Sequence, residues 1–205
     1  MILFLYLASL GKLGRVYADR AGPVVYAHEI LNGNWRLHNW DLTTYANYHE
    51  LLFYVPGVAI SGMNMDAMRL IPAFIFALNI FLVVCVIWRF SPKPSWWIYL
   101  PVLIFLVLPS NGAWRISLEG ATHHATTMAM LLCLLLVDKN LEAHGWKRIA
   151  YLTIISVVAS CSDVSFAYLF VIPTVAAILW THRLDRHLLR ACTATIVLPV
   201  VVGSI

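Results

Sequence analysis

Charged residues are scarce in this 205-residue sequence, where they make up 12% of the chain, about half the share found in ordinary soluble domains. Hydrophobic residues make up 61%. A water-soluble fold of this length cannot bury so much apolar surface, because its exterior still needs polar groups that face water. The composition therefore excludes a soluble enzyme, a nucleic-acid-binding domain and a disordered segment, and no nucleic-acid partner is expected.

The sequence also lacks the motifs of nucleotide and metal sites. It has no glycine-rich phosphate loop, so a cytoplasmic nucleotide site has no support. The adjacent His123 and His124 do not favour a metal site, since neighbours on a helix point about 100° apart. No metal ligand set is predicted. The cysteines form no CxxC pair and lie in or at the ends of apolar runs, where a thiol packs as a small hydrophobe; they are Cys85, Cys133, Cys161 and Cys192.

What the chain does have is a series of apolar runs, several of which approach the length of a membrane-spanning helix, about 20 residues. The clearest is 70–88, which carries no charge and lies between Arg69 and Arg89. The others are 1–10, 95–114, 120–137, 149–162, 164–181 and 191–205, of which the first and last are read as incomplete spans. We therefore predict an all-α fold: one polytopic membrane helix bundle over 1–205, with about six spanning segments, the N-terminal part of a longer protein.

Residues 51–65 are uncharged but short, and Pro56 and Gly57 lie in their middle. If this segment lies in the membrane interface, the loops 89–94, 138–148 and 181–190 fall on one side. Those loops hold eight of the 14 basic residues and only three of the ten acidic ones. The positive-inside rule makes that side cytoplasmic. We therefore expect a multi-pass membrane protein whose long first loop, 11–66, is external and carries interfacial helices.

Acidic residues concentrate on the external side, and Asp19 is the first of them. It lies just before the segment 23–31, which is predicted to form an amphipathic helix that holds Asp19 at the membrane surface. The alternative is a solvated carboxylate near a helix start, where carboxylates are common. The residues that recur at helical spacing in this segment are Val24, Val25, His28 and Leu31.

A second candidate group lies at the external end of the run 120–137. Arg115, Glu119 and His123 are spaced four residues apart and share one helical face. A guanidinium, a carboxylate and an imidazole in this arrangement could bind a phosphate and an acceptor hydroxyl. The alternative is an ion pair on a helix surface, which contributes a few tenths of a kcal/mol.

Several segments carry a family pattern in their order. The early acidic residue Asp19 lies in YADRAG. An amphipathic helix that ends at Asn/Gly is expected in AHEILNGNW, and an interfacial helix that ends at Gly is expected in YHELLFYVPGVAISG. MRLIPAFIFALNIFLVV then opens a span with Arg69, and WRISLEGATHHATTMAMLLCLLL holds Arg115 and Glu119. This order resembles the N-terminal half of the GT-C membrane glycosyltransferases, in the group of the protein mannosyltransferases and lipid A aminoarabinose transferases.

Two departures from that pattern stand out. Tyr48, His49 and Glu50 replace a basic residue and proline pair before the interfacial helix. Ser162 and Asp163, in VASCSDVSFAYLFVIPTVAAIL, replace the lysine that serves the lipid phosphate in the aminoarabinose transferases.

The resemblance implies transfer of a sugar from a polyprenyl-phosphate donor to an acceptor hydroxyl, on the outer face of a bacterial cytoplasmic membrane. Asp19 would be the general base, and Glu119 would position the acceptor or share a divalent cation with Asp19. That cation is the only cofactor left open, and membrane lipids are the other expected partners. The residues that would bind the donor phosphate or substrate are Arg69, Arg115, His123, His49 and Glu50.

Two other classes stay open. A transporter or flippase would also hold ionisable groups between helices, and the break at SCSD suits it, but its charges are expected at mid-membrane depth. The clustering of acids at one face favours surface chemistry instead. A non-catalytic membrane subunit or a truncated remnant is consistent with the incomplete first and last runs.

Overall fold

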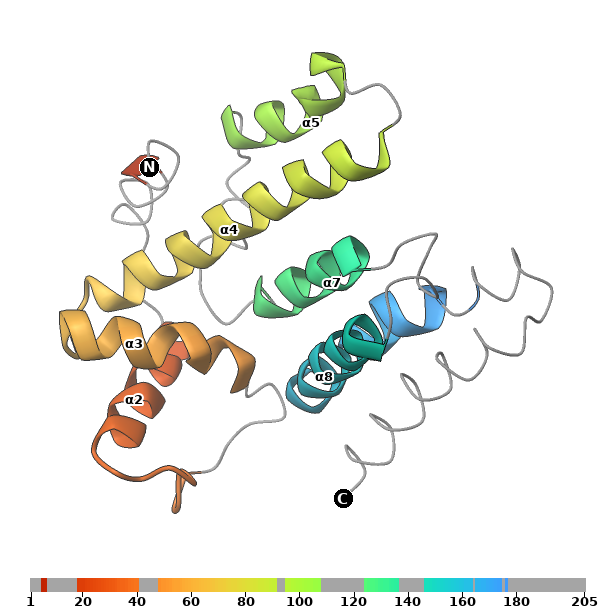
Figure 1. Ribbon diagram of the computed structural model, residues 1–205. Helices are drawn as coiled ribbons and strands as arrows, with labels where there is room; N and C mark the ends of the chain where they lie inside the picture. Colours follow the sequence, from red (N-terminus) through yellow and green to blue (C-terminus); the bar gives the residue numbers. More distant parts are fainter. Residues whose placement is uncertain are drawn as a thin grey trace. The chain divides into compact units, whose positions relative to one another are not determined.

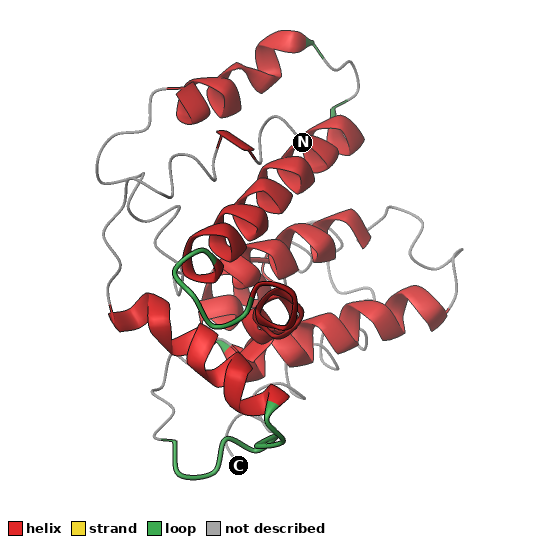
Figure 2. Cartoon of the chain, turned by 90° about the vertical axis from the view of Figure 1, so that its left-hand side faces the viewer, coloured by secondary structure: helices red, strands yellow, loops and turns green. Residues whose placement is uncertain are grey.

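The computed structural model describes residues 5–6, 18–40, 48–91, 95–107, 124–136, 146–163, 165–174 and 176. Every regular element in these ranges is a helix, so the predicted all-α class is confirmed there (Figures 1 and 2). The chain forms two compact units, Met1–Ala125 and Thr126–Ile205. The described elements of the first unit are α2 (Ala18–Leu31), the 3-10 helix η1 (Tyr48–Glu50), α3 (Leu51–Ser61), α4 (Ala67–Phe90) and α5 (Trp96–Val107).

Helix α4 is the one helix in the described part of the chain that is long and apolar enough to cross a membrane. Its 24 residues extend about 36 Å at the rise of an α-helix, more than the hydrocarbon core of a bilayer needs. Only 28% of its most apolar 18-residue stretch is buried by the rest of the chain, whereas the core helix of a soluble protein would be mostly buried. Phe74, Phe81 and Trp88 recur every seven residues as an exposed apolar stripe on α4. The helix predicted over the clearest run, 70–88, is therefore present.

The segment predicted to lie in the interface folds as the short helix α3. Its 11 residues extend about 17 Å, too little to cross a bilayer. The helix ends at Ser61, and Gly62 after it has a positive φ of 75° that suits glycine. Asn64 then connects α3 to α4: its side-chain amide donates to the Ser61 carbonyl, and its Oδ1 accepts the Ala67 amide at 2.9 Å. That second bond satisfies one of the free amides at the start of α4.

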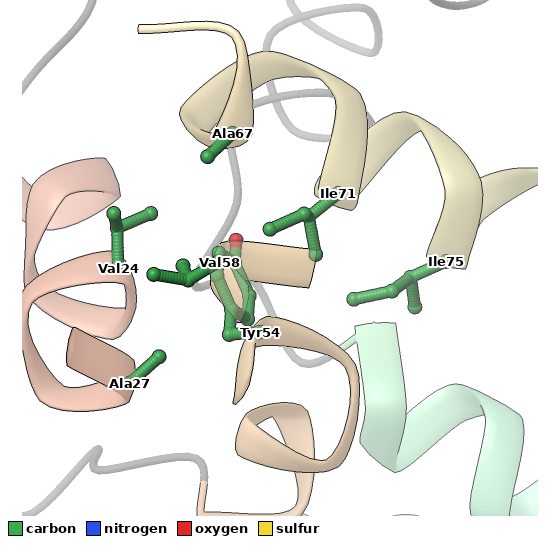
Figure 3. Close-up of a cluster of buried hydrophobic side chains, with 7 residues drawn as sticks. All are labelled: Val24, Ala27, Tyr54, Val58, Ala67, Ile71 and Ile75. Carbon is green, nitrogen blue, oxygen red and sulfur yellow. The ribbon is translucent and has the colours of Figure 1, made fainter. Parts of the chain in front are cut away.

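The core of the first unit lies where α2, α3 and the first half of α4 meet (Figure 3). Tyr54 and Val58 of α3 lie one turn apart and fill the space between the other two helices. Gly57 permits the close approach of α3 to α4, since a Cβ there would lie 2.6 Å from the Cδ1 atom of Ile71. The other members of this cluster are Val24 and Ala27 from α2, and Ala67 and Ile75 from α4.

The buried face of α2 differs in part from the predicted stripe. The helix begins at Ala18 and buries Val24 and Ala27, whereas His28 is only half-buried and Leu31 is exposed. The difference arises because α3 packs against α2 near its middle, and Leu31 already lies in the last turn, where the chain leaves the helix.

In the second unit, α7 (His124–Leu136) continues from the first unit and packs against α8 (Trp146–Ser162). Thr126 of α7 contacts Asp163 just after α8, and Cys133 of α7 contacts Ser156 earlier in α8, so the two helices run antiparallel. Ala129 and Ala159 lie buried in the same cluster. Small residues on both helices permit close approach of their backbones.

The predicted break at Asp163 is present. Helix α8 ends at Ser162, and a helical segment that contains the π-helical turn η2 (Ala167–Val171) follows. The helices α5, α7 and α8 coincide with parts of three predicted spans, but their described lengths are below that of a span. The number of spanning segments therefore stays a prediction.

Candidate functional site

Two buried ionisable side chains among the described residues of the first unit lie just before α3. Glu50 is 1% exposed and His49 is 6% exposed, and both belong to η1, which leads directly into α3. Glu50 precedes Tyr54 by one helical turn, so its carboxylate lies on the helix face that is buried in the core. Burial of a carboxylate and an imidazole is costly unless polar groups compensate. Both residues were predicted to bind substrate.

Arg69 and Asp19 lie near the starts of the two helices that pack against α3. Arg69 is the third residue of α4 and is half-buried. Its Nε atom is buried and makes no hydrogen bond among the described residues. Asp19 is the second residue of α2, and its side chain lies outside the described part. One helical unit thus contains the backbone of Asp19, the buried His49 and Glu50, and Arg69.

The other three predicted site residues, Arg115, Glu119 and His123, lie outside the described residues. The predicted meeting of Asp19 with Glu119 at one membrane face therefore stays a prediction. The neighbouring His124 is described: it is buried at the start of α7, and its ring lies 5.8 Å from that of Phe76.

Asn79 makes a polar contact that sequence reasoning missed. It is buried near the middle of α4, where its side-chain amide donates to the backbone carbonyl of His124 at 2.9 Å. Its Oδ1 atom is also buried and has no hydrogen-bond partner in the described part of the chain. The available signal was an asparagine within an otherwise apolar run, since such a residue needs a partner inside the protein.

Asp163 forms a second polar centre, in the second unit. From the sequence it was expected to be one of the external acids, at the break between two apolar runs where the aminoarabinose transferases have a lysine. Its carboxylate is buried and accepts two hydrogen bonds, from the Thr126 hydroxyl at 2.5 Å and from the Ser165 backbone amide at 2.9 Å. The second bond caps the helix that follows. Thr126 was not identified from the sequence, because nothing in ATTMAM shows which of its polar residues faces α8.

Within the described ranges, no three His, Cys, Asp or Glu side chains gather as a metal site would require. In the first unit the described ionisable side chains include the buried Glu50, His49 and His124 and the half-buried Arg69. A guanidinium can bind phosphate, and a carboxylate or an imidazole can accept or donate a proton. Comparisons with protein families, curated proteins and solved structures found no match. The elements that the structure describes are all helices, and one of them, α4, has the length and composition of a membrane span.

Proposed function

We propose that this chain is a multi-pass membrane glycosyltransferase that moves a sugar from a polyprenyl-phosphate donor to an acceptor hydroxyl outside the cytoplasm. One observation carries the proposal. Four residues of the proposed site belong to one helical unit. His49 and Glu50 are buried just before α3, Arg69 lies near the start of α4, and Asp19 lies near the start of α2. Ionisable groups at the end of a spanning helix suit a donor whose charged head stays at the bilayer surface.

The length of α4 supports the membrane setting of the proposal. α4 has the length and apolar surface of a span, and α3, too short to cross, packs against the N-terminal half of α4. An interfacial α3 leaves the basic loops on the cytoplasmic side, so the start of α4 faces outward. The other apolar runs would complete the bundle.

In the proposed reaction the acceptor oxygen attacks the anomeric carbon of the donor sugar. The bond from that carbon to the phosphate oxygen breaks, and the polyprenyl phosphate leaves. Asp19 takes the proton of the acceptor hydroxyl as general base, and Glu119 orients the acceptor. Fixed positive charge from Arg69 and Arg115, with His123, stabilises the departing phosphate. His49 and Glu50 shape the donor-binding end of α3.

The test is sugar transfer by the full-length protein in vesicles that contain a polyprenyl-phosphate sugar, with Asp19→Asn as the main variant. Loss of a general base is expected to slow transfer by about 100-fold or more. Asp66→Asn is the matched control, because Asp66 is an exposed carboxylate just before α4 and is not assigned to the site. Wild-type transfer by Asp19→Asn would remove Asp19 from the base role.

A transporter is the second candidate, and the buried contact between Thr126 and Asp163 favours it. A carboxylate buried at a helix break is a common feature of ion and substrate pathways. The two functions are separable in one preparation. The transporter would be favoured by two results together: the wild type moves a solute or ion across the vesicle membrane but transfers no sugar, and Asp163→Asn abolishes that flux.

A further inference from the structure

The loop that follows α2, residues 32–40, is tightly built although it lies at the surface. α2 ends in a Schellman motif, in which the Gly33 amide bonds the Ile30 carbonyl and the Asn34 amide bonds the Glu29 carbonyl. Gly33 has a φ of +93°, which glycine adopts without strain. The backbone therefore leaves the helix in one defined direction.

Side chains then fix the rest of the loop. The Asn34 amide donates to Glu29 Oε2 at 3.1 Å, and Asn34 Oδ1 accepts the His38 amide at 2.9 Å. Leu37 is only 4% exposed and keeps a left-handed φ of 47°, a costly conformation for leucine that its burial offsets. Trp40 packs edge-to-face on Tyr26 of α2, with ring centroids 5.3 Å apart.

The result is a fixed platform that presents Trp35 and Arg36 to the surroundings. Trp35 is 80% exposed, and Arg36 beside it is exposed as well. Arg36 is the one formally charged residue between 32 and 40, and Glu29, beneath the loop, is hydrogen-bonded to Asn34. Most of the Trp35 ring therefore has no protein neighbour, and it stands beside a cationic side chain on a loop that hydrogen bonds hold in one conformation, so both side chains are available to a partner.

The packing of α2 places the loop next to the start of α4. α2 packs on α3 and on the first turns of α4, through Val24 and Ala27 on one side and Ala67 and Ile71 on the other (Figure 3). These first turns are one end of the helix that has the length of a span. If α4 spans a bilayer, these first turns lie at its surface, and the loop that leaves α2 is within reach of that surface, where tryptophan is enriched and where arginine meets lipid phosphate.

We propose that residues 32–40 form a membrane-surface anchor, in which Trp35 inserts among lipid headgroups and Arg36 pairs with the phosphate of an anionic lipid. The amphipathic indole suits the interface better than water or the hydrocarbon core. The anchor needs no sugar transfer, so its test is independent of the function proposed above. It would hold α2, and with it the start of α4, at a fixed depth.

The test uses the full chain in lipid nanodiscs and isolates Trp35 as the difference in fluorescence between the wild type and Trp35→Phe. The discs contain phosphatidylcholine with phosphatidylglycerol, and either lipid carries bromine near the carbonyl end of its acyl chains. We expect bromolipid to quench the Trp35 component strongly and aqueous iodide to quench it weakly. Strong quenching by iodide with none by bromolipid overturns the proposal.

The role of Arg36 is tested by comparing how strongly brominated phosphatidylglycerol and brominated phosphatidylcholine quench the Trp35 fluorescence. One arginine at an anionic surface is expected to enrich phosphatidylglycerol about fivefold near Trp35. Arg36→Gln should abolish the stronger quenching by brominated phosphatidylglycerol, while Lys147→Gln, which removes another exposed positive charge, should preserve it. Equal preference in wild type and Arg36→Gln overturns the pairing with lipid phosphate. A blue shift of Trp35 that requires a soluble oligosaccharide and not lipid overturns the anchor and would assign the loop to sugar stacking instead.

Discussion

The hydroxyl of Thr126, in the first turn of α7, donates a 2.5 Å hydrogen bond to the buried carboxylate of Asp163, just beyond the end of α8. The same carboxylate caps the next helical segment through the Ser165 amide. One acidic side chain thus joins the end of one helix to the starts of two others. In an apolar setting such a bond is stronger than in water, and a carboxylate that loses its donor there stays desolvated.

We expect Thr126→Val to lower the free energy of unfolding by about 2 kcal/mol, since it removes a hydrogen bond to a charged group and leaves the Asp163 carboxylate buried. Thr126→Ser keeps the hydroxyl and is the matched control, with a smaller loss from the missing methyl group. The measurement is a denaturant titration in mixed micelles. Equal midpoints for Thr126→Val and the wild type would contradict the proposed importance of this bond.

The close approach of α3 to α4 gives a second prediction, at Gly57. A methyl group there would lie 2.6 Å from Cδ1 and 2.8 Å from Cγ1 of the buried Ile71, so either the Ile71 side chain or one of the two helices must shift. Overpacking of this kind costs about 1–3 kcal/mol, and we expect Gly57→Ala to lower the thermal midpoint.

Two further variants separate this contact from a general effect of alanine. At Gly22 in α2 the nearest atom to an added Cβ is 3.7 Å away, in the Tyr26 ring, so Gly22→Ala should be neutral or stabilising. Ile71→Ala should make Gly57→Ala less harmful than it is alone, because the obstructing atoms are gone. Additive losses in the double variant would show that Gly57 and Ile71 do not limit the packing.

A third prediction concerns the hydrogen bond from Asn79 to the His124 carbonyl. Asn79→Leu removes it while improving the apolar character of α4, so the two effects oppose one another. Hydrogen bonds between helices in membrane proteins contribute about 1 kcal/mol, and we expect a net loss of that order or less in the free energy of unfolding. Phe81→Leu, on an exposed face of α4, is the control that should change stability little. A clear gain in stability for Asn79→Leu would show that burial outweighs the bond.

The sequence is informative where a local rule is sufficient. The helix α4 follows from a charge-free run between two arginines, and the break at Asp163 follows from an acid inside an apolar run. The brevity of α3 follows from the length of its uncharged segment. Each of these inferences needs only neighbours along the chain.

Contacts between helices are a different matter, because their register depends on how side chains interlock in three dimensions. The pairing of Thr126 with Asp163 spans 37 positions, and that of Asn79 with His124 spans 45. Neither can be derived from helical periodicity, which identifies a face but not the residue opposite it. The same reason makes the burial of Glu50 visible only in the structure.

The last prediction tests whether Asn34 holds the 32–40 loop in place. Asn34→Ala removes the bonds to Glu29 and His38, which should lower the cost of opening the loop by about 1–2 kcal/mol and accelerate chymotryptic cleavage at Trp35 and Trp40 roughly tenfold. Asn32→Ala is the control, because that side chain is exposed and takes no part in the bonds from Asn34 to Glu29 and His38.

A charge exchange sharpens this test. Asn34→Asp keeps the acceptor for the His38 amide but directs a carboxylate at that of Glu29, so we expect faster cleavage here too. Adding Glu29→Gln to the same chain supplies an amide that can donate to the carboxylate introduced at position 34, and slow cleavage should return. If Asn34→Asp were cut no faster than the wild type, the contact with Glu29 would not hold the loop, and its rigidity would have to come from Leu37 and Trp40.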